Sequence, residues 1–550
     1  MTRLTQVGLA LLISGLVLLQ KGSSPLVTTA AAQGPNNAKQ QAQESTRDAP
    51  PDTTPYKRPM VREDFAPKGT RPIPLLPGVF IVDAVVNNTD PNLTNTDTFN
   101  DGETSITVNP SNPNEIVVTA FSGGWGTNAP LWQSTDGGNI WTKQFTIPAP
   151  PGIAATGCPC DQAVDYGTAN QLSGTFLISD IFSGITTNPP SAAAWNWLVI
   201  GGVTQATNFN NGPPPGGVDQ PWLLVNIDPT IPAQDNVYVA YDDFTNGNNC
   251  VGDACDERVS ASYGMNPPNF TADNQSGTAT GSINPGHRLA VDPRNGSVYS
   301  LFQRNIAAGA GGSKNIDYML NRSTDGGTTW SLNGMAGGII VANGDSTQPT
   351  PKFGTVNALL GGVDHAAVDP NNGDIYYAYG NRDASTGNDR LAIRRIQDNG
   401  GGGVTVGPEN FVTGQVEAAI PSVAVASDGT VGIFYYTFDG TSPDSFPIFS
   451  AHLAQSTDQG VTFSDQVLLT FLSSAMDNGN SRQRVLGDYM QMKAVGNCFY
   501  GAFTGNGVPF GRPFANHDPI FFKSCVAAPP RPTPTPRSRP TPAPRPTPSR

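Results

Sequence analysis

The sequence has little charge and almost no histidine, and it lacks the signatures of several common catalytic folds. Only 14% of its 550 residues are charged, four are histidine, and the formal net charge is −13. Because nucleic-acid binding depends on cationic neutralisation of phosphate, this balance argues against a nucleic-acid partner. The chain contains no P-loop, no dinucleotide-binding glycine motif, no H-E-x-x-H and no G-x-S-x-G. Mechanisms that depend on those motifs are therefore not expected.

Long apolar runs are also missing, with one exception near the start of the chain. The stretch Val7–Leu19 follows Arg3 and precedes the small residues Ala30-Ala31-Ala32. It is shorter than the roughly 20 residues needed to span a bilayer. The pattern is typical of a secretory signal peptide and predicts one over residues 1–32. We therefore expect a secreted or cell-surface protein with no membrane span after signal removal; an uncleaved anchor is the alternative.

The chain has only six cysteines, which is an even number. In an exported protein this favours disulfides. Two pairings are expected from the spacing, Cys250 with Cys255 and Cys498 with Cys525. The pair Cys158 and Cys160 has only one intervening residue, so a bridge there would be strained, and a metal site is the rival interpretation.

Glycine (61) and proline (50) are abundant, and no long segment has a helical period. This composition predicts many short strands and turns. Residues 33–76 are polar and proline-rich, which predicts a flexible leader. Residues 528–550 alternate Pro, Thr and Arg, which predicts a disordered tail of extended polyproline type.

Between these ends the chain repeats one sequence pattern. In each repeat, an apolar strand is followed by a turn that contains Asn or Asp, and then by a second, aromatic-rich strand. Clear copies lie at 103–121, 220–244, 287–302 and 364–380, and looser ones at 161–182, 421–437 and 488–505. Each unit has the length of a four-stranded blade with loops, which predicts an all-β propeller.

A second motif, S-x-D-x-G-x-x-[WF], follows the strand pair in three of these units. Its Ser and Asp can bond turn amides, its Gly accepts positive φ, and its aromatic residue can pack inward. The residues are Ser134, Asp136, Gly138, Trp141, Ser323, Asp325, Gly327, Trp330, Ser456, Asp458, Gly460 and Phe463. These segments resemble the Asp-box, or bacterial neuraminidase repeat, of sialidase-like propellers. The resemblance implies that the twelve residues are structural and lie away from the ligand site.

Seven units predict seven blades in a domain spanning residues 77–527, expected to be a monomer. The last unit supplies only three strands, and the apolar stretch 78–86 is expected to provide the fourth and close the ring. Six blades remain the alternative if residues 160–207 form a degenerate insertion.

Polar residues stand just before the first strand of six units. Equivalent positions in a propeller converge on one axis, so we expect these side chains to form a ligand-binding funnel at one mouth of the central channel. The funnel residues are Asp161, Gln162, Asp219, Gln220, His287, Asp364, His365 and Asp488, with Asp101, Glu103, Arg288 and Tyr489. Three interpretations stay open. The side chains could only form hydrogen bonds to the amides of strand ends and to channel waters, they could form a ligand site in which carboxylates also hold Ca²⁺, or they could form a catalytic site.

The resemblance to sialidases implies specific roles for some of these residues. Tyr489 would be the nucleophile, Glu103 or Glu417 its partner, and Asp101 the acid. Arg288, Arg382 and Arg484 are the candidates for a carboxylate-binding arginine triad.

We expect binding of a carbohydrate or extracellular polymer at the funnel, without a required cofactor. The alternatives are a glycoside hydrolase of exo-α-sialidase type and a protein-interaction platform. The sequence does not identify the ligand.

Overall fold

The structure is a computed structural model, and it describes most of the repetitive region. The described residues are 73–76, 78–84, 101–121, 128–148, 160–167, 170–177, 181–200, 203–204, 218–243, 254–280, 287–308, 314–346, 364–383, 385–386, 389–400, 403–412, 417–473, 486–510 and 517–525. The predicted signal peptide, most of the predicted leader and the predicted tail lie outside these residues.

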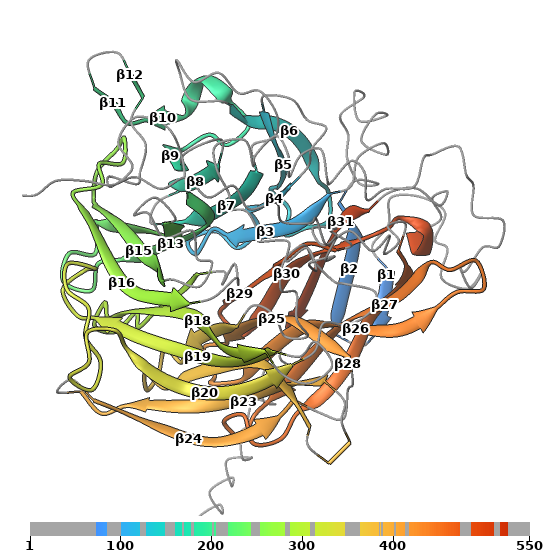
Figure 1. Ribbon diagram of the computed structural model, residues 1–550. Helices are drawn as coiled ribbons and strands as arrows, with labels where there is room; N and C mark the ends of the chain where they lie inside the picture. The colour runs from blue at the N-terminus through green and yellow to red at the C-terminus, as the bar shows by residue number, and fades with distance from the viewer. Residues whose placement is uncertain are drawn as a thin grey trace, which may run out of the picture.

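Antiparallel sheets follow one another around a ring, each formed from consecutive strands (Figure 1). The first blade contains β3 (Gly102–Val108), β4 (Ile116–Phe121), β5 (Asn128–Ser134) and β6 (Thr142–Pro148). The second contains β7 (Cys160–Tyr166), β8 (Leu172–Leu177), β9 (Ile181–Thr186) and β10 (Asn196–Trp197). The third contains β13 (Val218–Ile227), β14 (Asp235–Asp243), β15 (Ala254–Tyr263) and β16 (Ala272–Thr280).

The next three blades follow the same order. Blade four contains β17 (Arg288–Val291), β18 (Val298–Ala308), β19 (Lys314–Ser323) and β20 (Ile339–Ser346). Blade five contains β21 (His365–Val368), β22 (Ile375–Arg382), β23 (Asp389–Asp398) and β24 (Val404–Phe411). Blade six contains β25 (Ala418–Val425), β26 (Val431–Thr441), β27 (Pro447–Ser456) and β28 (Ser464–Leu472).

The seventh blade joins both ends of the described chain. Its strands are β29 (Gln491–Val495), β30 (Cys498–Gly505), β31 (Asp518–Cys525) and β2 (Val79–Asp83), with β1 (Ile73–Leu76) added at the outer edge. The strand β2 pairs antiparallel with β31, as expected for residues 78–86. The protein is therefore a seven-bladed β-propeller closed by its N-terminal strand, and the six-blade alternative is wrong.

The small remaining elements lie between or beside the blades. A two-stranded sheet is made by β11 (Val199–Ile200) and β12 (Val203–Thr204). Within the described residues the helical segments are the short 3₁₀ turns η3 (Ala192–Ala194) and η6 (Val508–Phe510). No helix in this part of the chain has the length and apolar character needed to cross a membrane.

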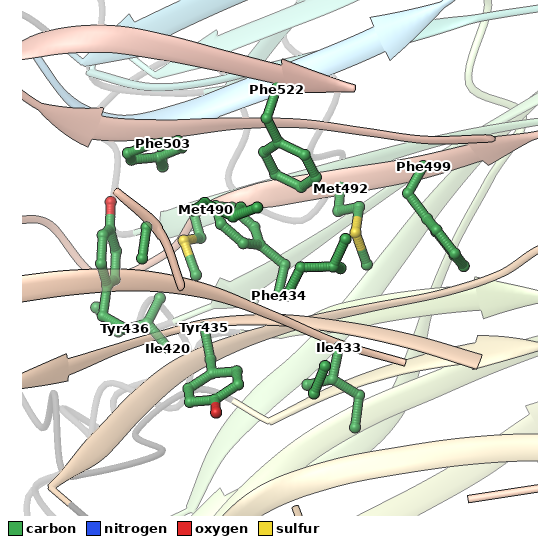
Figure 2. Close-up of a cluster of buried hydrophobic side chains, with 14 of the residues drawn as sticks. Ile420, Ile433, Phe434, Tyr435, Tyr436, Met490, Met492, Phe499, Phe503 and Phe522 are labelled. Carbon is green, nitrogen blue, oxygen red and sulfur yellow. The ribbon is translucent and has the colours of Figure 1, made fainter. Parts of the chain in front are cut away.

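The hydrophobic core is divided among the interfaces between neighbouring blades. Between blades six and seven, for example, the rings of Phe434 and Phe522 lie 4.7 Å apart, and Met492 belongs to the same cluster (Figure 2). Because both faces of a blade are covered by its neighbours, strands such as β3, β14 and β25 are buried along their whole length rather than at alternate residues.

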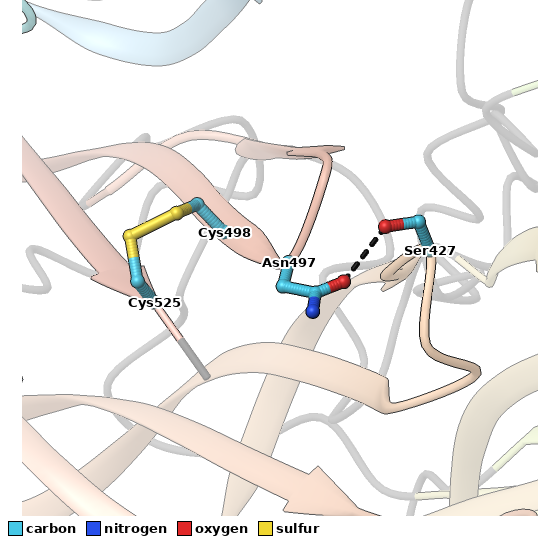
Figure 3. The surroundings of a disulfide bond; sticks show 4 residues. All are labelled: Ser427, Asn497, Cys498 and Cys525. Atoms are coloured by element: carbon cyan, nitrogen blue, oxygen red, sulfur yellow. Dashed lines mark hydrogen bonds between the residues drawn. A yellow bond between two sulfur atoms is a disulfide. The ribbon is translucent and has the colours of Figure 1, made fainter. Parts of the chain in front are cut away.

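One disulfide reinforces the closing blade. Cys498 and Cys525 are directly paired across β30 and β31, and they form the predicted bond (Figure 3). Asn497, which precedes Cys498, accepts a hydrogen bond of 2.7 Å from Ser427 of blade six. The other predicted pairs involve Cys158, Cys160, Cys250 and Cys255, whose side chains lie outside the described residues.

The recurring Asn or Asp after the inner strand has a local structural role. Its carboxyl or amide oxygen accepts a hydrogen bond from the backbone N–H two residues later, which fixes the turn into the second strand. This bond is present in four blades, with acceptors Asn109 (3.0 Å), Asp228 (2.8 Å), Asp292 (2.9 Å) and Asp369 (2.8 Å).

The three S-x-D-x-G-x-x-[WF] segments form one kind of turn between the third and fourth strands. In the first, Gly138 N–H donates to Ser134 Oγ (2.9 Å) and Ile140 N–H donates to Asp136 Oδ1 (2.9 Å). The other two turns repeat both bonds at 2.8–2.9 Å. Each turn packs against the neighbouring blade, as where Tyr263 donates to the carbonyl of Gly326 at 2.6 Å.

Candidate functional site

The seven inner strands surround a central channel and all begin at the same end. They contact one another in the closed order β3, β7, β13, β17, β21, β25, β29 and back to β3. Strand register places one residue of each at the same level, and we call this set the channel ring. It consists of Ser105, Ala163, Trp222, Arg288, His365, Ser422 and Gln491.

A repeated hydrogen bond supports this alignment. In four of the blade junctions, the backbone N–H that follows a ring residue donates to the ring side chain of the preceding blade. The bonds are Ile106 N–H to Gln491 Oε1 (3.1 Å), Val164 N–H to Ser105 Oγ (3.1 Å), Val423 N–H to His365 Nδ1 (3.0 Å) and Met492 N–H to Ser422 Oγ (2.9 Å).

Four inner strands begin with a β-bulge two residues before the channel ring. The bulged residue has positive φ although it is not glycine: Glu103 (51°), Asp161 (44°), Gln220 (47°) and Ile420 (57°). Such a conformation costs on the order of 1–3 kcal/mol and persists only where the surroundings hold it. The mouth of the channel is therefore held in a strained geometry in blades one, two, three and six.

Arg288 is the central cation of the mouth. Its guanidinium carbon Cζ lies 4.3 Å from the centre of the Trp222 ring and 5.2 Å from that of Tyr489. The Trp222 ring also meets His365 edge to face, with ring centres 5.5 Å apart. Arg288 Nη1 donates to the carbonyl of His287 (3.0 Å), while in the described structure Nε and Nη2 have no hydrogen-bond partner. The side chain is only 1% exposed, and burial lowers its pKa.

Carboxyl groups from three blades interact electrostatically with this cation. The charges of Asp242, Asp364 and Asp161 all favour the protonated guanidinium. Asp364 accepts a hydrogen bond from Gln303 Nε2 (2.9 Å) and another from the hydroxyl of Tyr377. Burial raises the pKa of Asp364 to about 6 in spite of these bonds.

A second acidic pair lies beside this group. Asp242 and Glu257 are directly opposite each other on β14 and β15, and both are fully buried. Burial and the neighbouring Asp242 charge raise the pKa of Glu257 well above its usual value. This direction is the expected one, because two ionised carboxylates in one dry site repel each other.

Several predicted funnel residues instead form hydrogen bonds to neighbouring strands of the channel wall. Gln162 accepts from Thr119 Oγ1 (2.6 Å) and donates to the carbonyl of Ala120 (2.5 Å), which ties blade two to blade one. His287 lies between blades three and four, with Nε2 2.7 Å from Ser300 Oγ. Burial lowers the pKa of both His287 and His365 to about 3.

The remaining predicted residues are placed as follows. Glu103 Oε1 accepts from the backbone N–H of Asp488 (3.1 Å), and the backbone N–H of Asp101 donates to the carbonyl of His517 (3.1 Å). Arg382 ends β22 and is partly exposed. Glu417 precedes β25 with a φ of 50°. Arg484 and the side chain of Asp219 lie outside the described residues.

Trp222, Asp242 and Glu257 were not predicted from the sequence. The predicted funnel residues all precede inner strands, whereas second strands end, and third strands begin, at the same mouth. The pair Asp242-Asp243 at the end of an aromatic-rich strand was the available signal. Among the described residues, no group of three or more His, Cys, Asp or Glu side chains is arranged to hold a metal ion.

Comparison with known proteins adds little at the sequence level: no model of a protein family and no curated protein matches this chain. Several solved structures are similar in fold. One is a protein of unknown function from Dyadobacter fermentans, 13% identical, covering 82% of this chain and 100% of that chain with a TM-score of 0.39. Another is an ulvan lyase, 10% identical, covering 73% and 91%, with a TM-score of 0.41.

A third is the endosialidase of phage phi92, 9% identical, covering 81% of this chain and 70% of that chain with a TM-score of 0.39. At such identities and TM-scores, these likenesses carry no argument about ligand or reaction. The assignment of a propeller rests on the strand order of this chain itself.

Proposed function

We propose that this protein is an exported, sialidase-like propeller that binds a carbohydrate chain at the mouth of its central channel. The observation that carries the proposal is Arg288, a buried guanidinium without an ion pair whose Nε and Nη2 have no hydrogen-bond partner in the described structure. Two N–H donors of this buried cation have lost water without gaining an acceptor, so a ligand that accepts their hydrogen bonds would be favoured.

The groups around Arg288 match the chemistry of a sugar. Carboxylates such as Asp161 and Asp364 accept hydrogen bonds from hydroxyl groups, and Arg288 donates to hydroxyl or ring oxygens. The cluster contains more acids than cations, so it favours a neutral oligosaccharide over an acidic one. The disulfide Cys498–Cys525 and the three repeated turns agree with an exported protein of sialidase-like type.

A glycan array probed with the full chain tests this proposal. We expect signals on neutral oligosaccharides that disappear in Arg288→Met, which keeps the length of the side chain and removes its donors. Arg294→Met is the matched control, because Arg294 follows the same inner strand at its far end and pairs with Asp292 at 2.7 Å. No signal on any glycan, or equal signals in Arg288→Met, would contradict the proposal.

A hydrolase is the second candidate, and the contact between Tyr489 and Arg288 favours it. Tyr489 was the predicted nucleophile, and the carboxylate of Glu103 bonds the backbone of the preceding residue, Asp488. Release of fluorophore from a fluorogenic sialoside by the parent, with none by Tyr489→Phe, would support this candidate. A folded parent without activity would remove the sialidase reaction from consideration.

A further inference from the structure

A largely apolar cavity lies at the other end of the channel, beyond the channel ring. Its volume is about 290 Å³, and it lies against the ring residues Trp222, His365 and Gln491. Its far side reaches the turns that follow the inner strands, at Pro293 and Pro370. Arg288, on which the proposed carbohydrate site is centred, does not line this cavity, although its neighbours Trp222 and His365 do.

The next level of the channel has a polar side and an apolar side. Residues two positions after the channel ring share its orientation, because side chains alternate along a strand. On the polar side, Lys493 Nζ pairs with Asp165 (3.0 Å), which also accepts from Thr107 Oγ1 (3.1 Å). On the apolar side stand Leu224, Ala290, Ala367 and Ala424, and all four line the cavity.

Gln491 lines this cavity and has an unused hydrogen-bond donor. Its Oε1 accepts from Ser105 Oγ (2.7 Å) and from the backbone N–H of Ile106 (3.1 Å), so these bonds fix which end of the amide is oxygen. Its Nε2 is buried and has no hydrogen-bond partner in the described structure. A buried amide nitrogen in this position costs on the order of 1–3 kcal/mol unless something accepts from it.

His365 provides a second donor. Because Nδ1 accepts the backbone N–H of Val423 (3.0 Å), the neutral ring carries its proton on Nε2. The charges of Arg288 and Lys493 both disfavour a positive charge on this ring. These two charges also favour an anion bound beside the ring, and Lys493, which lines the cavity, is itself paired with Asp165.

The apolar lining and the volume of the cavity determine what kind of anion fits. Methyl groups of alanine, valine and leucine give water few partners, so a chain of waters is poorly held there. A volume of about 290 Å³ holds roughly ten non-hydrogen atoms, if each takes the ~30 Å³ of a water molecule. A carboxylate with a short hydrocarbon tail satisfies the donors with its head and covers the methyl groups with its tail.

We propose that the far end of the channel is a second ligand site, which binds a monocarboxylate of about six to eight carbons. The carboxylate accepts from Gln491 Nε2 and His365 Nε2, and the tail lies along Ala290, Ala367 and Ala424.

Calorimetric titration of the full chain with sodium octanoate at pH 8 tests this site. We expect saturable binding in the parent and affinity at least tenfold weaker for octylamine, which has the same tail and the opposite charge. Ala367→Leu fills the cavity and should weaken octanoate binding at least tenfold. Gln491→Glu keeps the acceptor for Ser105 and Ile106, replaces the donor with a carboxylate, and should have the same effect.

Gln455→Glu is the matched control, because among the described residues Gln455 Nε2 is also buried without a partner, and Gln455 does not line the cavity. It should bind octanoate like the parent. Thermal unfolding confirms that each variant is folded, and Ala367→Leu keeps the test valid if Gln491→Glu does not fold. No binding at 10 mM octanoate, equal binding of octylamine, or unchanged affinity in Ala367→Leu would overturn the proposal.

Discussion

Arg288 and Trp222 come from neighbouring inner strands, and the guanidinium of Arg288 lies 4.3 Å from the centre of the Trp222 ring. The same indole contacts Tyr489 of blade seven, with ring centres 5.8 Å apart, and His365 of blade five. One side chain therefore connects four blades across the channel. Such a contact stabilises the ring and holds Arg288 in place at the same time.

Trp222→Ala should lower the free energy of unfolding by about 3–5 kcal/mol, because it leaves a large cavity where four blades meet. Trp222→Phe keeps an aromatic face under the guanidinium and should cost only about 1–2 kcal/mol. Urea unfolding measured on the parent and both variants checks this order. Equal losses in the two variants would show that the aromatic contact with Arg288 contributes nothing.

The strand β2 should be essential for a stable ring. A chain that begins at residue 101 lacks β2 and leaves the edge of β31 unpaired, which invites aggregation. We expect it to elute as aggregate in size-exclusion chromatography. A chain that begins at residue 73 keeps both outer strands and should elute as a folded species. A soluble, cooperatively unfolding chain from residue 101 would show that closure by β2 is dispensable.

Gly138 should be intolerant of a side chain for two separate reasons. It has a φ of +96°, and an added Cβ would lie 2.3 Å from Phe521 of blade seven. Gly334→Ala is a control for the first reason alone, since Gly334 has a φ of +77° and open space around it. We expect a loss of about 1 kcal/mol in Gly334→Ala and at least twice that in Gly138→Ala, measured by urea unfolding. Similar losses would mean that Phe521 moves aside freely.

Stability should fall in acid because of a buried neutral histidine. His517 lies 3.0 Å from Ser473 Oγ, and burial lowers its pKa from 6.5 to about 3. A lowered folded-state pKa gives stability that is complete above pH 6.5 and is lost as the pH falls toward 3. The difference in unfolding free energy between the parent and His517→Asn should therefore shrink by about 2 kcal/mol from pH 7 to pH 5.

Urea unfolding of both proteins at the two pH values gives this difference directly. Comparing the variant with the parent cancels the opposite effect of Asp364, whose raised pKa favours the folded state at low pH. A difference that does not change with pH would show that the pKa of His517 is the same in the folded and unfolded states.

Local patterns predicted most of the architecture. The Asp and Asn after each inner strand, such as Asp292, and the S-x-D-x-G turns depend on neighbours in sequence, so their geometry could be read directly. The closing strand was also predictable, because the last unit had three strands and one apolar stretch was left over at 78–86.

The site could be predicted only in outline. Bulges insert one residue at Glu103, Asp161 and Gln220, but the inner strands of Arg288 and His365 begin without one. Aligning the units by sequence therefore placed Arg288 and His365 level with Glu103, whereas they lie two residues deeper in the channel. The contact of Arg288 with Trp222 and the pair Asp242–Glu257 depend on packing between strands, which no local pattern shows.

Calorimetric titration with the strongest neutral oligosaccharide from the glycan array tests the central claim most directly, when the parent and Arg288→Met are measured side by side. The account predicts saturable binding in the parent and at least a thirtyfold weaker affinity in Arg288→Met, which corresponds to about 2 kcal/mol. Equal affinities in two folded proteins would contradict it, and the ligand would then bind somewhere other than the mouth of the channel.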